Sequence, residues 1–416
     1  MAKKQLVELL SPAGDLKKMQ FAFLYGADAV YCGLPAFSLR AKTGFDLGGL
    51  EKAIDYVKKN KKKVYVTINI FAHEKHIKAL PEYLKKLAKI KPHALIISDP
   101  GIIHLAQKYC PQIAIHLSTQ ANTINSEAVK FWKKMGVNRV ILGRETSLKD
   151  IQAIHKAVPK MELEIFVHGA MCLSYSGRCY LSSWLNNRSG NEGLCTQPCR
   201  WDYKVKLEEK LRPGEFLEVE NDDKGTYILN SKDLCLFDYL SELIKAGVIS
   251  FKIEGRTKSH YYVASITNAY RQAIDILLDP KIKNKQKLLA KAREELFKVD
   301  HRGYTTGFLL GNEAETREDF ETSKAFTDWE LVGEVVKIKK EASGIHAYIK
   351  VHNTLLANEK IEILTPENLY TLRLHIITNA KGEDITEAHG GTEEVFSVLL
   401  PADYVIIEGS LLRKKK

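Results

Sequence analysis

The sequence predicts an α/β protein: a (β/α)8 TIM-type barrel, allowing for some distortion, with a cysteine-bearing insertion and a small C-terminal antiparallel β-barrel. Three observations lead to this prediction. Short β-like runs alternate with amphipathic helical stretches from the N-terminus, which is typical of βα units around a parallel sheet. One long segment interrupts this rhythm before the last strand. Beyond Trp329 the pattern changes to short alternating strands.

Eight short apolar runs are the predicted barrel strands: Glu8–Leu10, Ala29–Cys32, Val64–Ile68, Ala94–Ser98, Ala114–Leu117, Arg139–Leu142, Leu163–Val167 and Ser250–Ile253. Helices with apolar residues at three- and four-residue spacing are expected between them, for example at Leu50–Lys59, His76–Lys89, Ser126–Met135 and Leu148–Ala157. Glycines stand where several helices should stop, at Gly26, Gly136 and Gly247. Eight units favour a closed barrel over an open sheet, although a strand count does not by itself decide closure.

The predicted domains follow from where this rhythm holds and where it fails. Residues 1–278 form the barrel, with an insertion at 169–235 where a short loop is usual. A helix at Leu236–Ala246 restores the rhythm, and Tyr261–Leu278 is the last barrel helix. Residues 279–327 form a helical and linker segment, and residues 328–412 form the C-terminal barrel.

The charge balance favours a polyanionic partner. There are 62 Lys and Arg against 51 Asp and Glu, a formal charge of +11, which suits RNA. The alternative is a lysine-coated surface, because much of the excess lies in clusters expected to be exposed, at Lys58–Lys63 and Arg413–Lys416. The chain has no apolar run long enough for a membrane span and no secretory signal, so a cytoplasmic protein without a membrane partner is expected.

Four of the seven cysteines lie within the predicted insertion, as Cys172-x6-Cys179-x15-Cys195-x3-Cys199. In a cytosolic chain such a cluster favours metal over disulfides. Zinc sites usually use closely spaced pairs, and the first pair here is too wide, so a 4Fe-4S cluster is favoured over zinc. Inert buried cysteines are the third alternative. Cys32 and Cys110 are expected in the core, whereas Cys235, after a predicted strand Thr226–Leu229, is an alternative ligand to Cys195 or Cys199.

Working residues of a (β/α)8 barrel stand at the carboxyl ends of its strands, which gives a list of candidates without any alignment. Asp99 is at such a position, and the predicted catalytic residues are His168, Glu145, Lys252 and Glu254. The predicted substrate-binding residues are Asn69, His116, Gln120, Arg144 and Arg256. Lys252, Glu254 and Arg256 alternate, which places them on one face of the last strand and suits a phosphate or carboxylate. A structural histidine and a solvated salt-bridge ladder are the alternatives for His168 and for this face.

A peptidase has to be considered against the same residues. The sequence contains neither an HExxH zinc motif nor a G-x-S-x-G elbow. A Cys172/His168 nucleophilic pair is conceivable, but a metal-bound thiolate is a poor nucleophile. Aromatic residues near the cysteines can stack on unpaired bases beside Arg178, Arg188 and Arg200, and packing explains them equally well. They are Tyr175, Tyr180, Trp184, Trp201 and Tyr203.

One run of residues resembles the signature of the collagenase-like peptidase family, peptidase U32. The run consists of Glu164, Phe166, Gly169, Ala170, Met171, Cys172, Gly177, Cys179, Leu181 and Ser182. The segments ELLSPAGD, VYCG, LSTQANTIN, LNSKDL, FKIEGR and HRGYTTGF are also similar to that family, so the resemblance spans nearly the whole chain.

The resemblance implies RNA modification more than peptide hydrolysis. Similar members are linked to prephenate-dependent conversion of the tRNA wobble uridine to 5-hydroxyuridine, and relatives hydroxylate ribosomal RNA or ubiquinone precursors. Several carry a 4Fe-4S cluster, which implies Cys172, Cys179, Cys195 and Cys199 as its ligands here. Prephenate is then an expected co-substrate and tRNA the expected partner, with a homo-oligomer or a hetero-oligomer with a related family member left open. A collagenase-like endopeptidase and a non-catalytic iron-sulfur partner subunit are the alternative functions.

Overall fold

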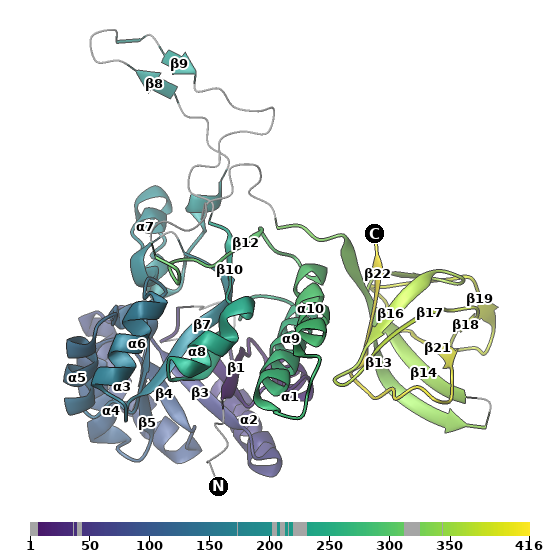
Figure 1. Cartoon of the computed structure of the whole chain (residues 1–416), viewed down its shortest axis with the longest axis horizontal. Coiled ribbons are helices and arrows are strands. Elements are labelled where there is room, and N and C mark those ends of the chain that lie inside the picture. Colours follow the sequence, from purple (N-terminus) through teal and green to yellow (C-terminus); the bar gives the residue numbers. More distant parts are fainter. Residues whose placement is uncertain are drawn as a thin grey trace.

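The structure is a computed structural model that describes residues 7–35, 37–39, 44–172, 174–201, 206–208, 213–214, 216–218, 231–311, 325–342 and 344–416. It consists of a barrel domain and a C-terminal sheet domain that lie side by side (Figure 1). Within the described residues, no helix combines the length and the apolar character needed to cross a bilayer.

The barrel is closed by eight parallel strands, which confirms the predicted fold class. They are β1 (Glu8–Pro12), β2 (Ala29–Gly33), β3 (Lys63–Ile68), β4 (Ala94–Ile97), β5 (Ala114–Leu117), β6 (Arg139–Ile141), β7 (Glu162–Ala170) and β11 (Val248–Ile253). Each strand pairs in parallel with the next, and β11 pairs with both β7 and β1, so no edge is left open. All eight predicted strands are therefore present.

Helices connect the strands and cover the outside of the barrel (Figure 1). Several begin with an N-cap residue: the side chains of Asp15, Asp46 and Ser147, for example, each accept a hydrogen bond from a backbone N–H of the first turn. Asp99 caps its helix in the same way, which gives that candidate a structural role. The helices are α1 (Leu16–Leu24), α2 (Leu47–Asn60), α3 (Glu74–Ile90), α4 (Pro100–Tyr109), α5 (Ser126–Lys134), α6 (Leu148–Ala157), α8 (Leu240–Lys245) and α9 (His260–Leu278).

Strand β7 is where the barrel is distorted. Beyond its pairing with β6 and β11, its last residues pair antiparallel with β10 (Asp233–Cys235), which in turn pairs with β12 (Tyr304–Thr305). Gly169 makes this change of partner feasible, because its φ is +106° and a Cβ there would lie against the carbonyl oxygen of Glu254. The chain thus leaves the barrel after Ala170 in β7 and returns at Asp233 in β10, which pairs with Ala170.

The described residues of the insertion form few regular elements. Its elements are a short helix, α7 (Leu181–Asn186), and a two-stranded hairpin of β8 (Lys206–Glu208) and β9 (Phe216–Glu218) that projects away from the barrel (Figure 1). The predicted strand Thr226–Leu229 lies outside the described residues. The predicted helix Leu236–Ala246 is shorter, because a 3-10 turn at Phe237–Tyr239 precedes α8.

The C-terminal domain is antiparallel, as predicted. Its main sheet has the order β17-β16-β22-β13-β14-β21-β18-β19 around a separate apolar core. Among the described residues its edge strands β17 and β19 do not pair, so the sheet curls without closing into a hydrogen-bonded barrel. The strands are β13 (Trp329–Glu341), β14 (Gly344–Val351), β15 (Thr354–Leu356), β16 (Lys360–Leu364), β17 (Leu369–Arg373), β18 (Ile377–Thr378), β19 (Asp384–Ile385), β20 (Glu387–His389), β21 (Val395–Leu400) and β22 (Leu411–Lys415).

Buried polar contacts join the two domains. The Tyr25 hydroxyl of α1 donates to the backbone carbonyls of Leu364 and Gly409. Helix α10 (Lys285–Glu294) is followed by a 3-10 turn, Glu295–Lys298, whose side chains face the C-terminal sheet. Arg413 is fully buried there, so the prediction that Arg413–Lys416 is an exposed basic cluster is wrong for Arg413, and also for Lys414, which is 7% exposed. Both residues belong to strand β22 and pair with carboxylates.

Candidate active site at the barrel mouth

A pocket of about 550 Å³ lies at the carboxyl ends of the barrel strands. Residues from β2, β3, β7 and β11 line its floor, and residues of the insertion line its roof. This is the end of a (β/α)8 barrel at which enzymes of this architecture place their chemistry. The insertion therefore covers the open end of the barrel, so that strand residues line one side of the cavity and insertion residues line the other.

All four clustered cysteines line this pocket: Cys172, Cys179, Cys195 and Cys199. Burial raises the pKa of the Cys199 thiol, and the other three thiols raise it further. Cys199 is thus within electrostatic range of the other three thiols. Cys235 lies elsewhere, on β10, with its thiol 3.8 Å from the Tyr270 hydroxyl. Cys32 and Cys110 are buried in the core, as expected.

Specific hydrogen bonds hold the insertion against the barrel. Glu145 accepts from the backbone N–H of Ser176 at 2.6 Å and from its hydroxyl at 3.1 Å. The Arg178 guanidinium donates to the carbonyl of Gln120 at 2.9 Å. The Phe71 N–H donates to the carbonyl of Asn191, whose side chain in turn bonds the backbone of Cys179. Glu145, predicted as catalytic, does not line the pocket and positions the cysteine-bearing loop instead.

Beneath the pocket, charged groups are buried inside the barrel. The Lys252 ammonium lies 3.1 Å from Glu164, and both side chains are almost fully buried. Arg139 binds the same carboxylate at 3.0 Å. Burial lowers the pKa of Lys252, with Glu164 opposing the shift. A lysine whose pKa is lowered in this way can exchange a proton nearer neutral pH than an exposed one.

Polar residues of neighbouring strand ends form the pocket wall. Asn69 donates from its side-chain amide to Gln120 Oε1 at 2.8 Å, and both residues are buried. Gln120 Nε2 is buried and has no hydrogen-bond partner within the described part of the chain, so it is available to a ligand. Arg256 donates to the hydroxyls of Ser38 and Thr67, at 2.6 and 3.1 Å, which fixes its guanidinium against the wall.

Arg144 and Glu254 face each other across one side of the pocket. The Arg144 guanidinium stacks on the Phe166 ring at 3.9 Å from the centroid. Its distance to the Glu254 carboxylate is 3.7 Å, which is too long for a strong paired hydrogen bond. A planar guanidinium held by an aromatic face is suited to a carboxylate or phosphate ligand.

Positive charge predominates in the pocket lining. Glu254 is the one carboxylate among its described lining residues. Glu164 and Asp233 lie behind the wall and pair with Lys252 and Arg302, so only part of the excess is neutralised. The pocket therefore favours an anionic ligand. The lining cations are Arg144, Arg188, Arg200, Arg256, Arg302, Lys252 and Lys258.

The structure does not support direct chemistry by His168. Its ring is almost fully buried against Tyr262, Tyr270 and Tyr304 and does not line the pocket. Burial lowers the pKa of His168 to about 3, so the imidazole stays neutral near pH 7. Its Nδ1 lies 3.3 Å from the Tyr270 hydroxyl. His168 directly precedes Gly169, where β7 begins to pair with β10, and at this position its ring packs into the cluster of tyrosines.

His116 also lies outside the pocket lining, contrary to its predicted role in substrate binding. It is buried within the barrel, where its ring contacts Tyr65 edge-on at 4.7 Å. Burial and the neighbouring cations Arg139 and Lys252 lower its pKa well below the ordinary value. Ser118, two residues further along the chain, lines the pocket instead.

Two cations of the pocket lining were missed by the sequence analysis. Lys258 continues the alternation of Lys252, Glu254 and Arg256 by one more step, and that pattern could have included it. Arg302 belongs to the segment HRGYTTGF and reaches the pocket because β12 pairs with β10. No local signal in the sequence predicts that pairing.

Fold and pocket together define the class of protein. It is a (β/α)8-barrel protein whose anion-favouring pocket lies at the strand ends beneath a cysteine-bearing insertion, with an antiparallel sheet domain after the barrel. Two family models match these parts: peptidase family U32 over residues 14–319, and the peptidase family U32 C-terminal domain over residues 327–413. The chain belongs to peptidase family U32.

Curated relatives carry different names. The chain is 40% identical to tRNA hydroxylation protein P of Escherichia coli (strain K12), over 95% of this chain and 93% of that protein. It is 34% identical to tRNA hydroxylation protein P1 of Bacillus subtilis (strain 168), over 98% and 95%. It is 31% identical to a protein named collagenase of Porphyromonas gingivalis (strain ATCC BAA-308 / W83), over 73% of each chain.

Proposed function

We propose that this protein is an enzyme of tRNA hydroxylation that converts the wobble uridine to 5-hydroxyuridine with prephenate as co-substrate. The observation that carries the proposal is the 40% identity, along nearly the full length of both chains, with a protein named for tRNA hydroxylation. The cationic pocket supports it, since prephenate carries two carboxylates and RNA carries phosphates.

The donor set of the pocket suits an iron-sulfur cluster better than zinc. Four thiols share one pocket, and the described residues of its lining include no imidazole and the single carboxylate Glu254. Around a zinc ion the sulfurs would lie about 4 Å apart. Within the described residues, the only group of three or more candidate ligand atoms closer than 4.8 Å to one another is a different one, His260, Glu334 and His352. A wider arrangement suits a cluster in which each thiolate binds its own iron.

Cys172, Cys179, Cys195 and Cys199 would hold the 4Fe-4S cluster, which would supply one-electron chemistry when bound. The chain's own residues would then position and neutralise the substrates. Arg144 and Arg256 are placed to bind the carboxylates of the co-substrate, and Glu254 is placed to orient Arg144. Lys252, whose pKa burial lowers, is the residue we assign to proton exchange at the pocket floor.

The outer surface of the insertion is the proposed contact for the tRNA loop. Tyr175, Tyr180 and Trp184 are 50%, 75% and 78% exposed, which is unusual for residues of this size. Exposed aromatic side chains beside arginines are suited to stacking on unpaired bases. The same insertion contributes Arg188 and Cys195 to the pocket lining, so a base that stacks there would lie on the segment that covers the pocket.

Mass spectrometry of tRNA nucleosides tests the proposal. A strain without this gene should lose 5-hydroxyuridine and its derivatives, and the wild-type chain should restore them. Cys199→Ala should fail to restore them and should lower the iron content of anaerobically purified protein. Cys235→Ala is the matched control, because that cysteine lies outside the pocket, and it should retain iron and activity. An unchanged level of 5-hydroxyuridine in the deletion strain would overturn the proposed function.

Peptide hydrolysis is the second candidate, and the observation in its favour is the 31% identity with a protein named collagenase. That activity would require Cys172 as the nucleophile and His168 as its base. Cys172 lines the pocket, whereas the His168 ring is buried among tyrosines outside the pocket lining. Gelatin cleavage by the purified protein that disappears in His168→Phe would establish the peptidase. A non-catalytic partner subunit would instead require a second protein before tRNA is hydroxylated in vitro.

A further inference from the structure

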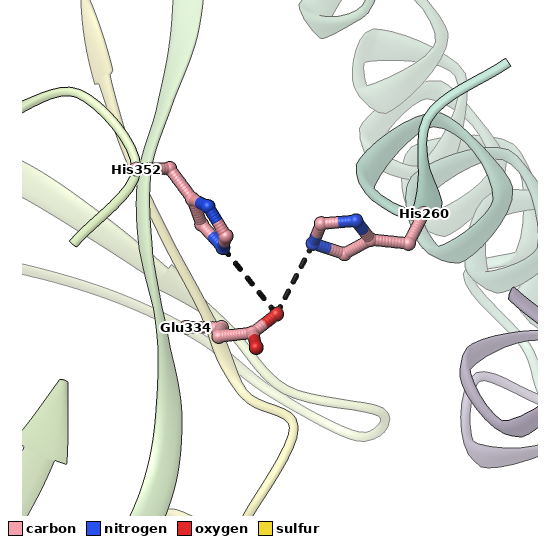
Figure 2. A group of neighbouring side chains, drawn as sticks. All are labelled: His260, Glu334 and His352. Atoms are coloured by element: carbon pink, nitrogen blue, oxygen red, sulfur yellow. Dashed lines mark ion pairs between the residues drawn. The ribbon is translucent and has the colours of Figure 1, made fainter. Parts of the chain in front are cut away.

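A second cluster of ligand-type side chains lies outside the pocket lining, at the junction of the two domains (Figure 2). His260 is the first residue of α9 in the barrel domain. Glu334 belongs to β13 and His352 directly follows β14, both in the C-terminal domain. Two separately built parts of the fold thus bring two imidazoles to one carboxylate.

The spacing of these groups is that of a metal site. The His260 Nε2 atom lies 3.1 Å from Glu334 Oε2, and the His352 Nε2 atom lies 3.5 Å from the same oxygen. All three ligand atoms lie within 4.8 Å of one another. Tetrahedral zinc with bonds of about 2.0 to 2.1 Å places its ligand atoms about 3.3 Å apart. The two short separations bracket that value.

Within the described part of the chain, the three facing ligand atoms make no hydrogen bond of normal geometry to any other group. These atoms are His260 Nε2, His352 Nε2 and Glu334 Oε2, and each is buried. The Glu334 side chain is only 8% exposed. Buried polar atoms are nearly always satisfied, so three that converge on one point call for a bound group.

Neighbouring side chains hold the ligands in place. The Lys17 ammonium binds the other carboxylate oxygen, Glu334 Oε1, at 2.7 Å, which leaves Oε2 directed at the histidines. The Phe21 ring packs against His260 with 4.9 Å between ring centroids and limits rotation of that imidazole. Such outer contacts orient metal ligands in known sites.

We propose that His260, Glu334 and His352 bind a Zn²⁺ ion that fastens the C-terminal domain to the barrel. Two imidazoles and a carboxylate suit zinc, and water would complete the coordination. The competing explanation for the same geometry is an ion-pair cluster of protonated histidines around Glu334, with no metal. Zinc binding at this place does not depend on the proposed function of the cysteine-lined pocket.

The test measures Zn²⁺ bound by the full-length chain after anaerobic loading of the cysteine site and removal of loose metal with a chelator. Loading first keeps added Zn²⁺ from the thiols. We expect one more Zn²⁺ per chain in the wild type than in His352→Ala, with at least about tenfold weaker binding in the variant. His389→Ala is the matched control, since His389 belongs to the same domain and is 67% exposed. It should bind Zn²⁺ as the wild type does.

Thermal unfolding supplies a second measurement on the same samples. Zn²⁺ should raise the melting temperature of the wild type and of His389→Ala, and not that of His352→Ala. If His352→Ala fails to fold, Co²⁺ bound to the wild type reports the ligands directly: weak visible bands without a thiolate charge-transfer band support the site. Equal Zn²⁺ binding by wild type and His352→Ala, or a strong thiolate band with Co²⁺, would overturn the proposal.

Discussion

The pocket and the domain junction both concentrate charge, yet they balance it differently. At the junction Lys17, Lys298 and Arg413 pair with the three carboxylates Glu334, Glu295 and Glu362. In the pocket lining seven cations face the single carboxylate Glu254. Buried charges that balance one another position parts of a protein, whereas an excess of positive charge in a cavity favours the binding of an anion. The comparison separates groups that hold the fold together from groups kept for a ligand.

The largest effect should come from the junction. Arg413→Ala removes a fully buried guanidinium that lies 2.6 Å from Glu295 and 2.7 Å from Glu362. Two carboxylates then remain close together, with Lys298 as their nearest remaining counter-ion, so we expect a loss of about 3 to 5 kcal/mol in the free energy of unfolding. Denaturant titration measures it. Arg373→Ala, at an exposed position, should change stability by less than about 0.5 kcal/mol.

Substitution of a pocket cation should weaken ligand binding while leaving the free energy of unfolding almost unchanged. Arg144→Gln removes a guanidinium whose described contacts are a long ion pair with Glu254 and stacking on Phe166, so unfolding should change little. Binding of the anionic co-substrate should weaken by about 1.5 to 3 kcal/mol, the range for a hydrogen bond to a charged group. Calorimetric titration with prephenate measures this, and Arg144→Lys should recover part of the affinity. A stability loss as large as that of Arg413→Ala would erase the contrast between the two regions.

Aromatic residues on the insertion should contribute less. Trp184→Ala should weaken tRNA binding by about 1 kcal/mol, the low end for a stacked base, without a change in melting temperature. Phe131→Ala is the control: this ring is 53% exposed on α5, on the outside of the barrel. Filter binding at fixed ionic strength compares the two variants. Equal losses would remove the insertion surface from the proposed tRNA contact.

The smallest effect at neutral pH should come from His168→Phe, and it should grow with acid. Burial lowers the pKa of His168 to about 3 in the folded protein, whereas an unfolded histidine titrates near 6.5. Between those values the unfolded chain binds a proton that the folded protein does not, so the wild type loses up to about 1.4 kcal/mol per pH unit from this group as pH falls. Phenylalanine removes that slope. Urea titrations at pH 7, 6 and 5 should show the two curves converging or crossing.

How far the sequence predicted the structure depended on whether the signal was local. The eight barrel strands were found because each is a short buried apolar run in a part of the chain where strands alternate with helices. The pocket residues Asn69, Gln120 and Arg256 followed from their place at strand ends. The change of strand partner at Gly169 could not be predicted, and the structure favours the alternative interpretation of His168 as a structural histidine over the predicted catalytic role.

Long-range pairing explains the other differences. Arg413 looked like part of a charged tail, yet it sits in β22 between β13 and β16 and meets Glu295, which is 118 residues earlier in the chain. Hydrophobic periodicity carries no information about such partners. The meeting of His260 with Glu334 and His352 was missed for the same reason, because it exists only once two domains have docked.

The double pairing of β7 has a consequence for how this family can diversify. Ala170 and Asp233 are direct partners across an antiparallel pair, so the excursion starts and finishes at adjacent points of the scaffold. Its length can therefore vary, or its contents be exchanged, without any strain reaching the eight-stranded ring. The barrel does not depend on the inserted segment. A short turn that joins those two residues should give a minimal protein that still folds but whose pocket is uncovered.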